Sequence, residues 1–351
     1  MTLLSITIFD VAREAGTSIS TVSKALNDSY TISEETKEHV RQVAKRLKYQ
    51  PNVRAQALAR KDGRQACFIT YLPRGIGFQN PHMFEILAGA EKALAAKNYV
   101  VTIQGSDPKN VCALVKDIVQ RKSADGLLLH ASVVTRELAA LLTKEEVPHI
   151  VIGMPSFNSR LCWIDNNNHI AGEIAAHHVL EENPQSIVFI GGKDKDKISQ
   201  ARLEGVKSEL ENAQRPIESL RVYQGESTAE NGYKMAVKML EEGVPDTVIC
   251  ANNYLAYGCL CALQLNNVDI PRDVSMITFD SYPFAQITWP KLTTVSIDVF
   301  EMGLQAGKLL VNKIKKPNLQ IQSFTTLPNL VVRESTHGSN KPEDGMPIKD
   351  D

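Results

Sequence analysis

The order of helix signals in residues 8–60 constrains the fold of this chain more than any other feature. Apolar side chains recur at i, i+3, i+4 and i+7, the spacing of one helix face, at Ile8, Val11, Ala12 and Ala15. Thr7 is a candidate N-cap of this helix, and Gly16 permits a tight turn after it. Ser18 then caps a second helix, which we expect to end near Leu26. These signals predict a helix-turn-helix.

A third helix is predicted directly after this pair. Ser33 is its candidate cap, and Glu34 and Glu35 place negative charge in the first turn, where the helix dipole favours it. Its buried face is expected to consist of Val40, Val43, Ala44 and Leu47. An ordinary three-helix domain is the alternative, because any small helical unit buries such stripes. The ordered series of cap, turn, second cap and third helix favours a DNA-binding domain.

The second helix divides into an inner and an outer face. Val22, Ala25 and Leu26 are expected to pack inward, whereas the outward side chains are Ile19, Ser20, Ser23 and Lys24. In a helix-turn-helix, the outward residues of the second helix lie in the major groove of DNA. Residues 1–63 contain ten Lys or Arg and seven Asp or Glu, which gives +3, while the other 29 basic and 33 acidic residues give −4. A positive balance on the small domain suits a surface that faces phosphates.

The segment from Ile8 to Asn27 resembles the headpiece of the lactose/galactose repressor family of transcription regulators. The resemblance is also carried by Ser33-Glu34-Glu35-Thr36, by Leu47-Lys48-Tyr49-Gln50-Pro51-Asn52 and by Ala55, Ala57 and Leu58, where the family has its hinge helix. It covers nearly the whole chain, and later segments look most like the branch of regulators that respond to maltose or related glucosides. The resemblance implies a sequence-specific DNA-binding repressor of carbohydrate-utilisation genes.

The resemblance also implies roles for single headpiece residues. Ile19, Ser20 and Lys24 match positions that contact base edges, suited to a thymine methyl, to several bases and to guanine respectively. Positions that hold the DNA backbone are matched by Thr21, Ser23, Asn27 and Tyr49. Leu58 matches the residue that wedges between base steps in the minor groove, and Ala55 is small enough to allow that approach. Ordinary packing is the alternative role for a leucine on a helix.

Length and composition predict an ordinary globular protein of two or three domains, since 351 residues are too many for one simple core. No apolar run is long enough to span a membrane, and no signal-peptide pattern is present, so we expect a cytoplasmic protein without a membrane partner. The six cysteines are scattered along the chain and lie mostly in apolar runs. This distribution is typical of buried free thiols in a reducing compartment. Cys259-x-Cys261 lacks metal-ligand spacing, and the adjacent His177 and His178 point to different helix faces, so neither a metal nor a cofactor is expected.

From Ala66 onward, short apolar runs alternate with stretches of helical period. Strands are predicted near 67–72, 100–104, 126–130, 149–152, 187–191, 247–251 and 274–279. Helices are predicted near 83–97, 109–121, 167–182, 200–212, 228–242, 254–266 and 299–315. Repeated strand–helix units imply parallel sheets covered on both faces, so the predicted fold class is α/β.

The family resemblance refines this class to an N-terminal all-α helix-turn-helix headpiece and a two-lobe, periplasmic-binding-protein-like body. By resemblance the chain crosses between the lobes near 164–166, 292–296 and 322–327. The first lobe is then 65–163 with 296–322, and the second is 166–292 with the final strand. The expected domains are a headpiece, a hinge helix with linker, a two-lobe effector-binding and dimerisation domain and a disordered tail, at 1–50, 51–64, 65–334 and 335–351.

A small ligand is expected in the cleft between such lobes, near strand ends. The candidate effector-binding residues are Phe78, Asn80, His130, Trp163, Asp165, Arg202, Asn252, Asp280 and Trp289. The fork of donors on Arg202 suits paired hydroxyls, and the carboxylate of Asp280 accepts from them. The alternatives are a surface ion pair for Arg202, a turn cap for Asp280 and interlobe packing for the two tryptophans. Polar groups beside aromatic rings suit a neutral polyol.

These features predict a transcription regulator that binds a pseudo-palindromic operator as a homodimer and is controlled by a small sugar, maltose or a related glucoside. Whether the sugar induces or corepresses stays open. The alternatives are a two-lobe sugar-binding protein without a DNA role and a regulator controlled by a protein corepressor. An enzyme is not expected, because the chain has no G-x-G-x-x-G, no G-x-x-x-x-G-K-[ST] and no nucleophile elbow.

Overall fold

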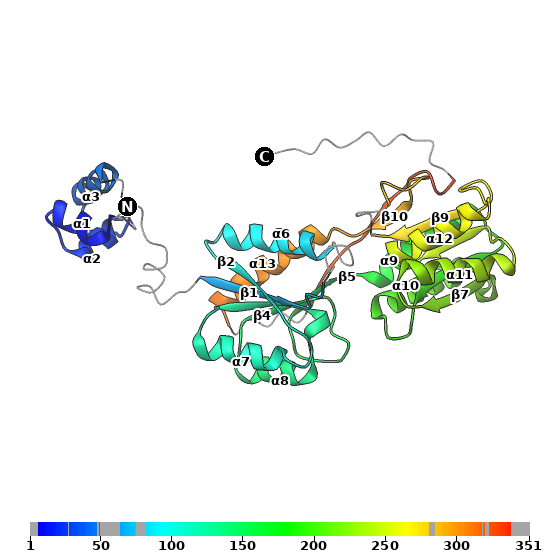
Figure 1. The fold of residues 1–351 in the computed structure, drawn as a ribbon, viewed down its shortest axis with the longest axis horizontal. Helices are drawn as coiled ribbons and strands as arrows, with labels where there is room; N and C mark the ends of the chain where they lie inside the picture. Colours follow the sequence, from blue (N-terminus) through cyan, green and yellow to red (C-terminus); the bar gives the residue numbers. More distant parts are fainter. Residues whose placement is uncertain are drawn as a thin grey trace. The chain divides into compact units, whose positions relative to one another are not determined.

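The computed structural model of the chain describes residues 6–26, 28–47, 49, 64–74, 82–280, 285–317, 319 and 323–337. By its internal contacts the chain divides into two compact units, Met1–Arg64 and Gln65–Asp351 (Figure 1). The first unit holds the headpiece, and the second holds both lobes of the body. Most of the predicted hinge, at 51–63, and the predicted tail from 338 onward lie outside the described residues.

Three helices form the headpiece: α1 (Ile8–Glu14), α2 (Ile19–Leu26) and α3 (Glu34–Arg46). Each predicted cap is present. The Asp10 carboxylate accepts the backbone N–H of Thr7 at 2.9 Å, and the hydroxyls of Ser18 and Ser33 accept backbone N–H groups at 3.1 and 3.3 Å. Gly16 adopts a φ of +60°, a conformation that favours glycine. The helices enclose a small core that includes Val11, Val22, Ala25, Val40 and Val43. The predicted helix-turn-helix and third helix are therefore confirmed.

Six parallel strands form the sheet of the first lobe, in the order β11-β5-β4-β3-β1-β2. They are β1 (Gln65–Thr70), β2 (Val100–Gly105), β3 (Gly126–His130), β4 (His149–Ile152), β5 (Trp163–Asn166) and β11 (Ser323–Thr326). The helices are α6 (His82–Ala95), α7 (Val111–Arg121), α8 (Arg136–Lys144) and α13 (Val299–Lys315), with the 3-10 turn η1 (Ala131–Val133).

Helices cover both faces of this sheet. Figure 1 shows α6 and α13 on one face and α7 and α8 on the other. Alternate residues of β1 follow this division, as the period of a strand requires. Phe68 packs among residues of α6 and α13, whereas Ile69 packs among residues of α7 and α8. The first lobe is therefore a three-layer α/β unit, as its repeated strand–helix pattern predicts.

The second lobe repeats this architecture with the strand order β12-β10-β9-β8-β6-β7, in which only β12 runs antiparallel to its neighbour. Its strands are β6 (Ile187–Gly192), β7 (Leu220–Gly225), β8 (Thr247–Cys250), β9 (Ser275–Phe279), β10 (Thr293–Ser296) and β12 (Asn329–Val331). Its helices are α9 (Asn168–Leu180), α10 (Lys197–Asn212), α11 (Ala229–Glu241) and α12 (Asn253–Leu265), with the 3-10 turn η2 (Ile217–Ser219).

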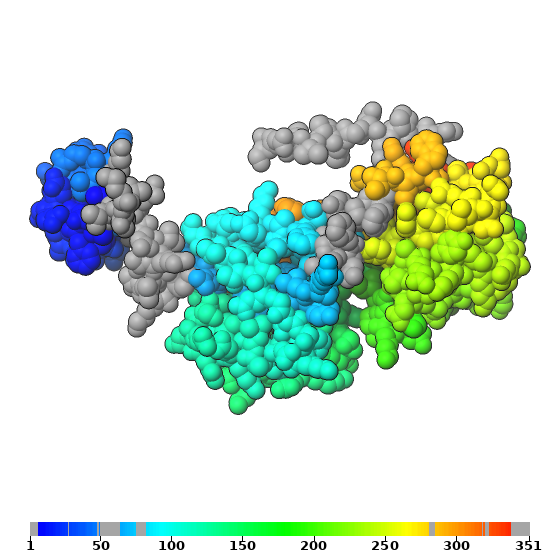
Figure 2. All heavy atoms as spheres, in the orientation of Figure 1, coloured from blue at the N-terminus to red at the C-terminus, as the bar shows by residue number. Residues whose placement is uncertain are grey.

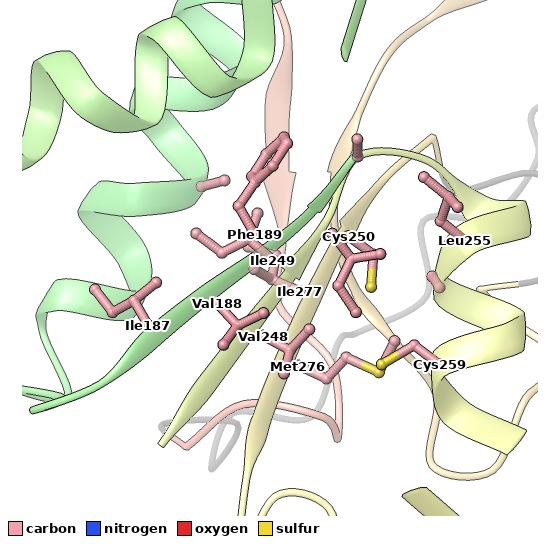
Figure 3. Packing of buried hydrophobic residues seen from close by; sticks show 14 of the residues in the cluster. Ile187, Val188, Phe189, Val248, Ile249, Cys250, Leu255, Cys259, Met276 and Ile277 are labelled. Atoms are coloured by element: carbon pink, nitrogen blue, oxygen red, sulfur yellow. The ribbon is translucent and has the colours of Figure 1, made fainter. Parts of the chain in front are cut away.

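The apolar runs predicted as strands supply the core of this lobe. Figure 3 shows side chains of β6, β8 and β9 packed beside Leu255 and Cys259 of α12. Phe189, Ile249 and Ile277 are almost completely buried there. The sequence prediction missed two of these elements. They are the helix α8 of the first lobe and the strand β7, in which only Tyr223 is buried.

The chain passes between the lobes after β5, β10 and β11. These strands match the three predicted crossings, which are therefore confirmed. As these crossings require, orange residues from the C-terminal part of the chain occur in both lobes in Figure 2.

The body also extends past its predicted limit at residue 334. Ser335 and Thr336 are fully buried, and the Ser335 hydroxyl accepts the backbone N–H of Thr293 at 2.8 Å, so the tail does not begin at 335.

The helix pair α9 and α10 crosses at two glycines. A Cβ added to Gly172 would lie 2.0 Å from the carbonyl oxygen of Arg202, and one added to Gly205 would lie 2.0 Å from that of His169. Only glycine allows the two backbones to approach this closely. The crossing therefore fixes α10, which carries Arg202, against α9.

None of the helices in the described ranges is long and apolar enough to cross a membrane. In the same ranges, no group of three or more His, Cys, Asp or Glu side chains is placed to hold a metal ion. The six cysteines are free thiols; five are buried and Cys261 is partly buried, as their apolar surroundings in the sequence predict.

We predict that Gly172→Ala lowers the free energy of unfolding by about 1–3 kcal/mol, because the added methyl forces α9 and α10 apart. Thermal and urea unfolding measure the loss. Gly225→Ala is the matched control, since its Cβ would meet the flexible end of the Met235 side chain at 3.3 Å and Asn231 Cβ at an ordinary contact distance of 3.5 Å. Equal stability of the Gly172→Ala variant and the unchanged chain would contradict the close crossing.

Candidate functional site

The outer face of α2 presents the side chains that the sequence predicts for base contacts. Ile19, Ser20 and Lys24 are exposed, while Val22 and Ala25 on the opposite face are fully buried. The division follows from the capped start of α2, because the Ser18 cap sets which residues of the next turns face the core. The helix therefore offers an apolar group, a hydroxyl and a cation on one open surface.

The headpiece cations differ in their surroundings. Arg46 pairs with Glu14 at 2.8 Å and Lys37 pairs with Glu34 at 2.6 Å. Lys24 forms no ion pair with any part of the chain that the structure describes. A lysine that neutralises no carboxylate of its own domain is available to an external acceptor. The exposed face of α2 therefore carries a cation that is suited to DNA.

The remaining predicted DNA contacts are less open. Thr21 is partly buried and its hydroxyl lies 2.9 Å from that of Ser18, within the helix cap. Ser23 is also partly buried. Tyr49 packs against the headpiece core, and burial raises the pKa of its phenol. The candidates outside the described residues are Asn27, Ala55 and Leu58.

A cavity of about 220 Å³ lies between the two lobes of the body. Both lobes contribute to its wall: α6, β3, β5 and α13 from the first, and α10, the start of α12 and the end of β9 from the second. The structure brings together five candidate effector-binding residues in this wall, namely His130, Asp165, Arg202, Asn252 and Asp280.

Arg202 joins three elements of the second lobe. Its Nε donates to Asn168 Oδ1 at 3.0 Å, and its Nη1 donates to the carbonyl oxygen of Ala251 at 2.6 Å. Both Nη atoms donate to the Asp280 carboxylate at 3.3 Å. Arg202 is only 3% exposed, so the surface ion pair that was its alternative interpretation is wrong. Its guanidinium also lies 4.5 Å from the centre of the Phe279 ring.

Asp280 follows β9 at a φ of +68°, which turns its carboxylate toward Arg202. An aspartate tolerates this left-handed conformation better than most residues. The carboxylate holds the guanidinium in a two-pronged pair, the geometry that makes such bonds strong. The pair fixes the second-lobe wall of the cavity.

Asp165 supplies a carboxylate from the first lobe. Its two oxygens accept the backbone N–H groups of Met154 and Asn166, at 2.8 and 2.7 Å. Burial raises the pKa of this carboxyl above its usual value, while the two N–H donors oppose the rise. Asp165 is therefore a rigidly held acceptor in the cavity wall.

His130 is a neutral group in the same wall, because burial lowers the pKa of its imidazole. Its Nδ1 lies 2.7 Å from the Ser132 hydroxyl and 3.3 Å from the Ser132 backbone nitrogen, so Ser132 orients the ring. His82, at the start of α6, also lines the cavity. Its buried Nδ1 has no hydrogen-bond partner in the described parts of the chain.

The remaining candidates differ in where they lie. Asn252 lines the cavity but uses its side-chain oxygen to cap α12, at 3.0 Å from the N–H of Leu255. Trp163 lines a neighbouring cavity, and Trp289 is 78% exposed and outside the lining of the interlobe cavity. Phe78 and Asn80 lie outside the described residues. The polar lining residues that the sequence analysis missed are His82, Asn166, Asn168, Asp196 and Ser199.

We predict that Asp280→Asn lowers the free energy of unfolding by about 3 kcal/mol, because it leaves a buried guanidinium without its counter-charge. Urea unfolding of the full chain measures the change. Glu230→Gln is the control, since it removes one partner of the exposed Lys234–Glu230 pair and is expected to change nothing measurable. A similar stability for both variants would show that the buried pair contributes little.

Comparison with known proteins agrees with this arrangement of domains. Residues 7–52 match the model of the bacterial regulatory proteins of the lacI family, and residues 176–336 match that of the periplasmic binding protein-like domain. The chain is 27% identical over 333 residues to the HTH-type transcriptional repressor PurR of Histophilus somni, which covers 94% of this chain and 98% of the relative.

Two solved structures share the fold along nearly the whole chain. A lac repressor dimer bound to operator and the anti-inducer ONPF aligns with a TM-score of 0.78 and 22% identity, covering 95% of this chain and 99% of that one. The complex of the transcriptional regulator CelR with cellobiose aligns with a TM-score of 0.69 and 23% identity, covering 94% and 99%.

Proposed function

The chain belongs to the lacI family of bacterial regulatory proteins, and we propose that it is an operator-binding repressor controlled by a small sugar. One observation carries the proposal: the same chain has an exposed face on α2 and a cavity that both lobes of the body line. The relatives are transcriptional regulators and not enzymes, in agreement with the sequence analysis.

We assign direct base contacts to Ile19, Ser20 and Lys24 on the outer face of α2. An apolar side chain, a hydroxyl and an ammonium group match a thymine methyl, a mixed hydrogen-bonding edge and guanine. Contacts to the DNA backbone are assigned to Thr21, Ser23, Asn27 and Tyr49, and the hinge contacts to Ala55 and Leu58.

The cavity favours a neutral, polyhydroxylated ligand over an anion. All three nitrogens of the Arg202 guanidinium already donate hydrogen bonds within the protein, so no unengaged fork faces a phosphate. The carboxylates of Asp165 and Asp280 would repel an anion but accept hydrogen bonds from hydroxyls. The neutral imidazole of His130 adds a further polar group. Maltose or a related glucoside is our first candidate, and the CelR structure provides a relative that was solved with a disaccharide.

Control of DNA binding follows from linkage. Two copies would place two headpieces on the half-sites of a pseudo-palindrome. A ligand that binds one arrangement of the lobes more tightly shifts the protein toward that arrangement. The ligand then changes operator affinity by the same factor by which the operator changes ligand affinity. A protein coregulator is the alternative source of control. Ordering of the hinge at 51–64 on DNA would connect body and headpiece.

Selection from random duplexes, with and without maltose, tests the whole proposal. We expect enrichment of a pseudo-palindrome whose binding changes with maltose. Enrichment of a palindrome whose binding does not change with maltose would support a DNA-binding regulator that is controlled by another sugar or by a protein partner. No enrichment at low salt would reject the DNA-binding role and favour a plain sugar-binding protein.

Lys24→Ala should weaken binding to the selected duplex about tenfold and relax the preference for guanine at one position of each half-site. Fluorescence anisotropy with the selected duplex and its single-base variants measures both effects. Lys45→Ala is the matched control, because Lys45 is an exposed headpiece lysine on α3. An identical loss for every duplex variant would assign Lys24 to phosphate contact.

Leu58→Ala should reduce specific operator binding and the bend of the bound duplex, because the minor-groove wedge is shortened. Gel mobility of circularly permuted duplexes measures the bend, and far-ultraviolet circular dichroism checks that the fold is retained. Unchanged affinity together with an unchanged bend would reject the wedge.

A further inference from the structure

A second cavity, of about 490 Å³, opens beside the interlobe cavity. Seven of its lining residues belong to the segment that connects β4 to β5 and to the first residue of β5: Met154, Pro155, Ser156, Phe157, Asn158, Ser159 and Trp163. Lys197, at the start of α10, provides the wall from the second lobe. We call this space the aromatic cavity, after Phe157 and Trp163.

At three places, residues that are close together in the chain line one cavity or the other. Gly153 lines the interlobe cavity and Met154 the aromatic one, and the Met154 N–H donates to Asp165 at 2.8 Å. Trp163 and Asp165 are two residues apart on β5, so they lie on the same face of the strand. Lys197 stands in the chain between Asp196 and Ile198, which both line the interlobe cavity. The two cavities are therefore neighbours.

The aromatic cavity combines two partly buried aromatic rings with polar groups. Phe157 and Trp163 are partly buried and pack against the α7–α8 side of the first-lobe core, which limits their motion. The Arg136 guanidinium lies 4.9 Å from the centre of the Phe157 ring. Ser156, Asn158 and Lys197 add hydrogen-bonding groups. Aromatic faces with a few polar groups are typical of small-molecule sites, and they match a sugar ring with its apolar C–H face and hydroxyl edge.

The interlobe cavity is small for a ligand of two rings. Its volume of about 220 Å³ is below the range of roughly 300–1,000 Å³ that is typical of pockets for drug-sized ligands. A single pyranose ring would use the carboxylates and His130 of this cavity. Any second ring of the same ligand must extend from it, and the neighbouring aromatic cavity offers Trp163 and Phe157 to that ring.

We propose that the effector has at least two sugar units, with one unit in the interlobe cavity and the next against Trp163 and Phe157. This inference rests on the proposed function, because it deepens the assignment of a sugar to the cleft. Lys197 reaches the aromatic cavity from the opposite lobe, so the second unit contacts both lobes. The aromatic cavity then selects for ligand length.

Calorimetric titration of the full-length chain with glucose, maltose and maltotriose tests the proposal. We expect the unchanged chain to bind maltose and maltotriose at least tenfold more tightly than glucose. Trp163→Leu and Phe157→Leu keep an apolar side chain against the core but remove the ring. Each should weaken maltose binding about tenfold and leave glucose binding unchanged, which also shows that the variant is folded. Trp289→Leu is the control, because this exposed ring lies outside both cavities.

Three outcomes would overturn the proposal, and they distinguish its failure from failure of the proposed function. Equal affinities for glucose and maltose in the unchanged chain, or maltose binding that survives both ring substitutions, would reject the aromatic cavity as a sugar site and retain the sugar-controlled regulator. A chain that binds its selected operator but none of the three sugars would reject the sugar assignment itself, and the aromatic cavity with it.

Discussion

The buried guanidinium of Arg202 is the interaction on which the ligand-facing side of the second lobe depends. It ties α9 through Asn168, the end of β8 through the Ala251 carbonyl and the end of β9 through Asp280. A cation buried this deeply must have its donors satisfied, so these three elements are held at one point. The close crossing of α9 and α10 at Gly172 and Gly205 brings Arg202 to that point. Packing and electrostatics therefore shape the cavity wall together.

Local signals were sufficient for most of the fold. Caps at Thr7, Ser18 and Ser33 placed the headpiece helices, because a capping side chain acts within one turn. Continuous apolar runs placed the buried strands. The strand β7 escaped prediction because it stands at the edge of its sheet and buries little apart from Tyr223, so its apolar pattern is weak. The burial of Ser335 and Thr336 also gave no local signal, since polar residues near a chain end are more often exposed.

The candidate site was only partly predictable, for a different physical reason. Strand ends of a parallel sheet meet at one edge, so polar residues there, such as Asp165 and Asp280, were found by position and family resemblance. His82, Asn168 and Ser199 reach the cavity from the first turns of three helices, and only the tertiary arrangement brings those helix starts together. Trp289 is a sequence candidate on its chemistry alone, and the structure places it at the surface, outside the cavity lining.

We propose above all that a sugar in the cleft and an operator on the headpieces bind the same chain with a shared coupling free energy. The most direct test is the affinity for maltose, measured by calorimetry with and without saturating selected operator duplex. Linkage requires the operator to change the maltose affinity by the same factor by which maltose changes the operator affinity. Identical maltose affinities in the two titrations would contradict the claim.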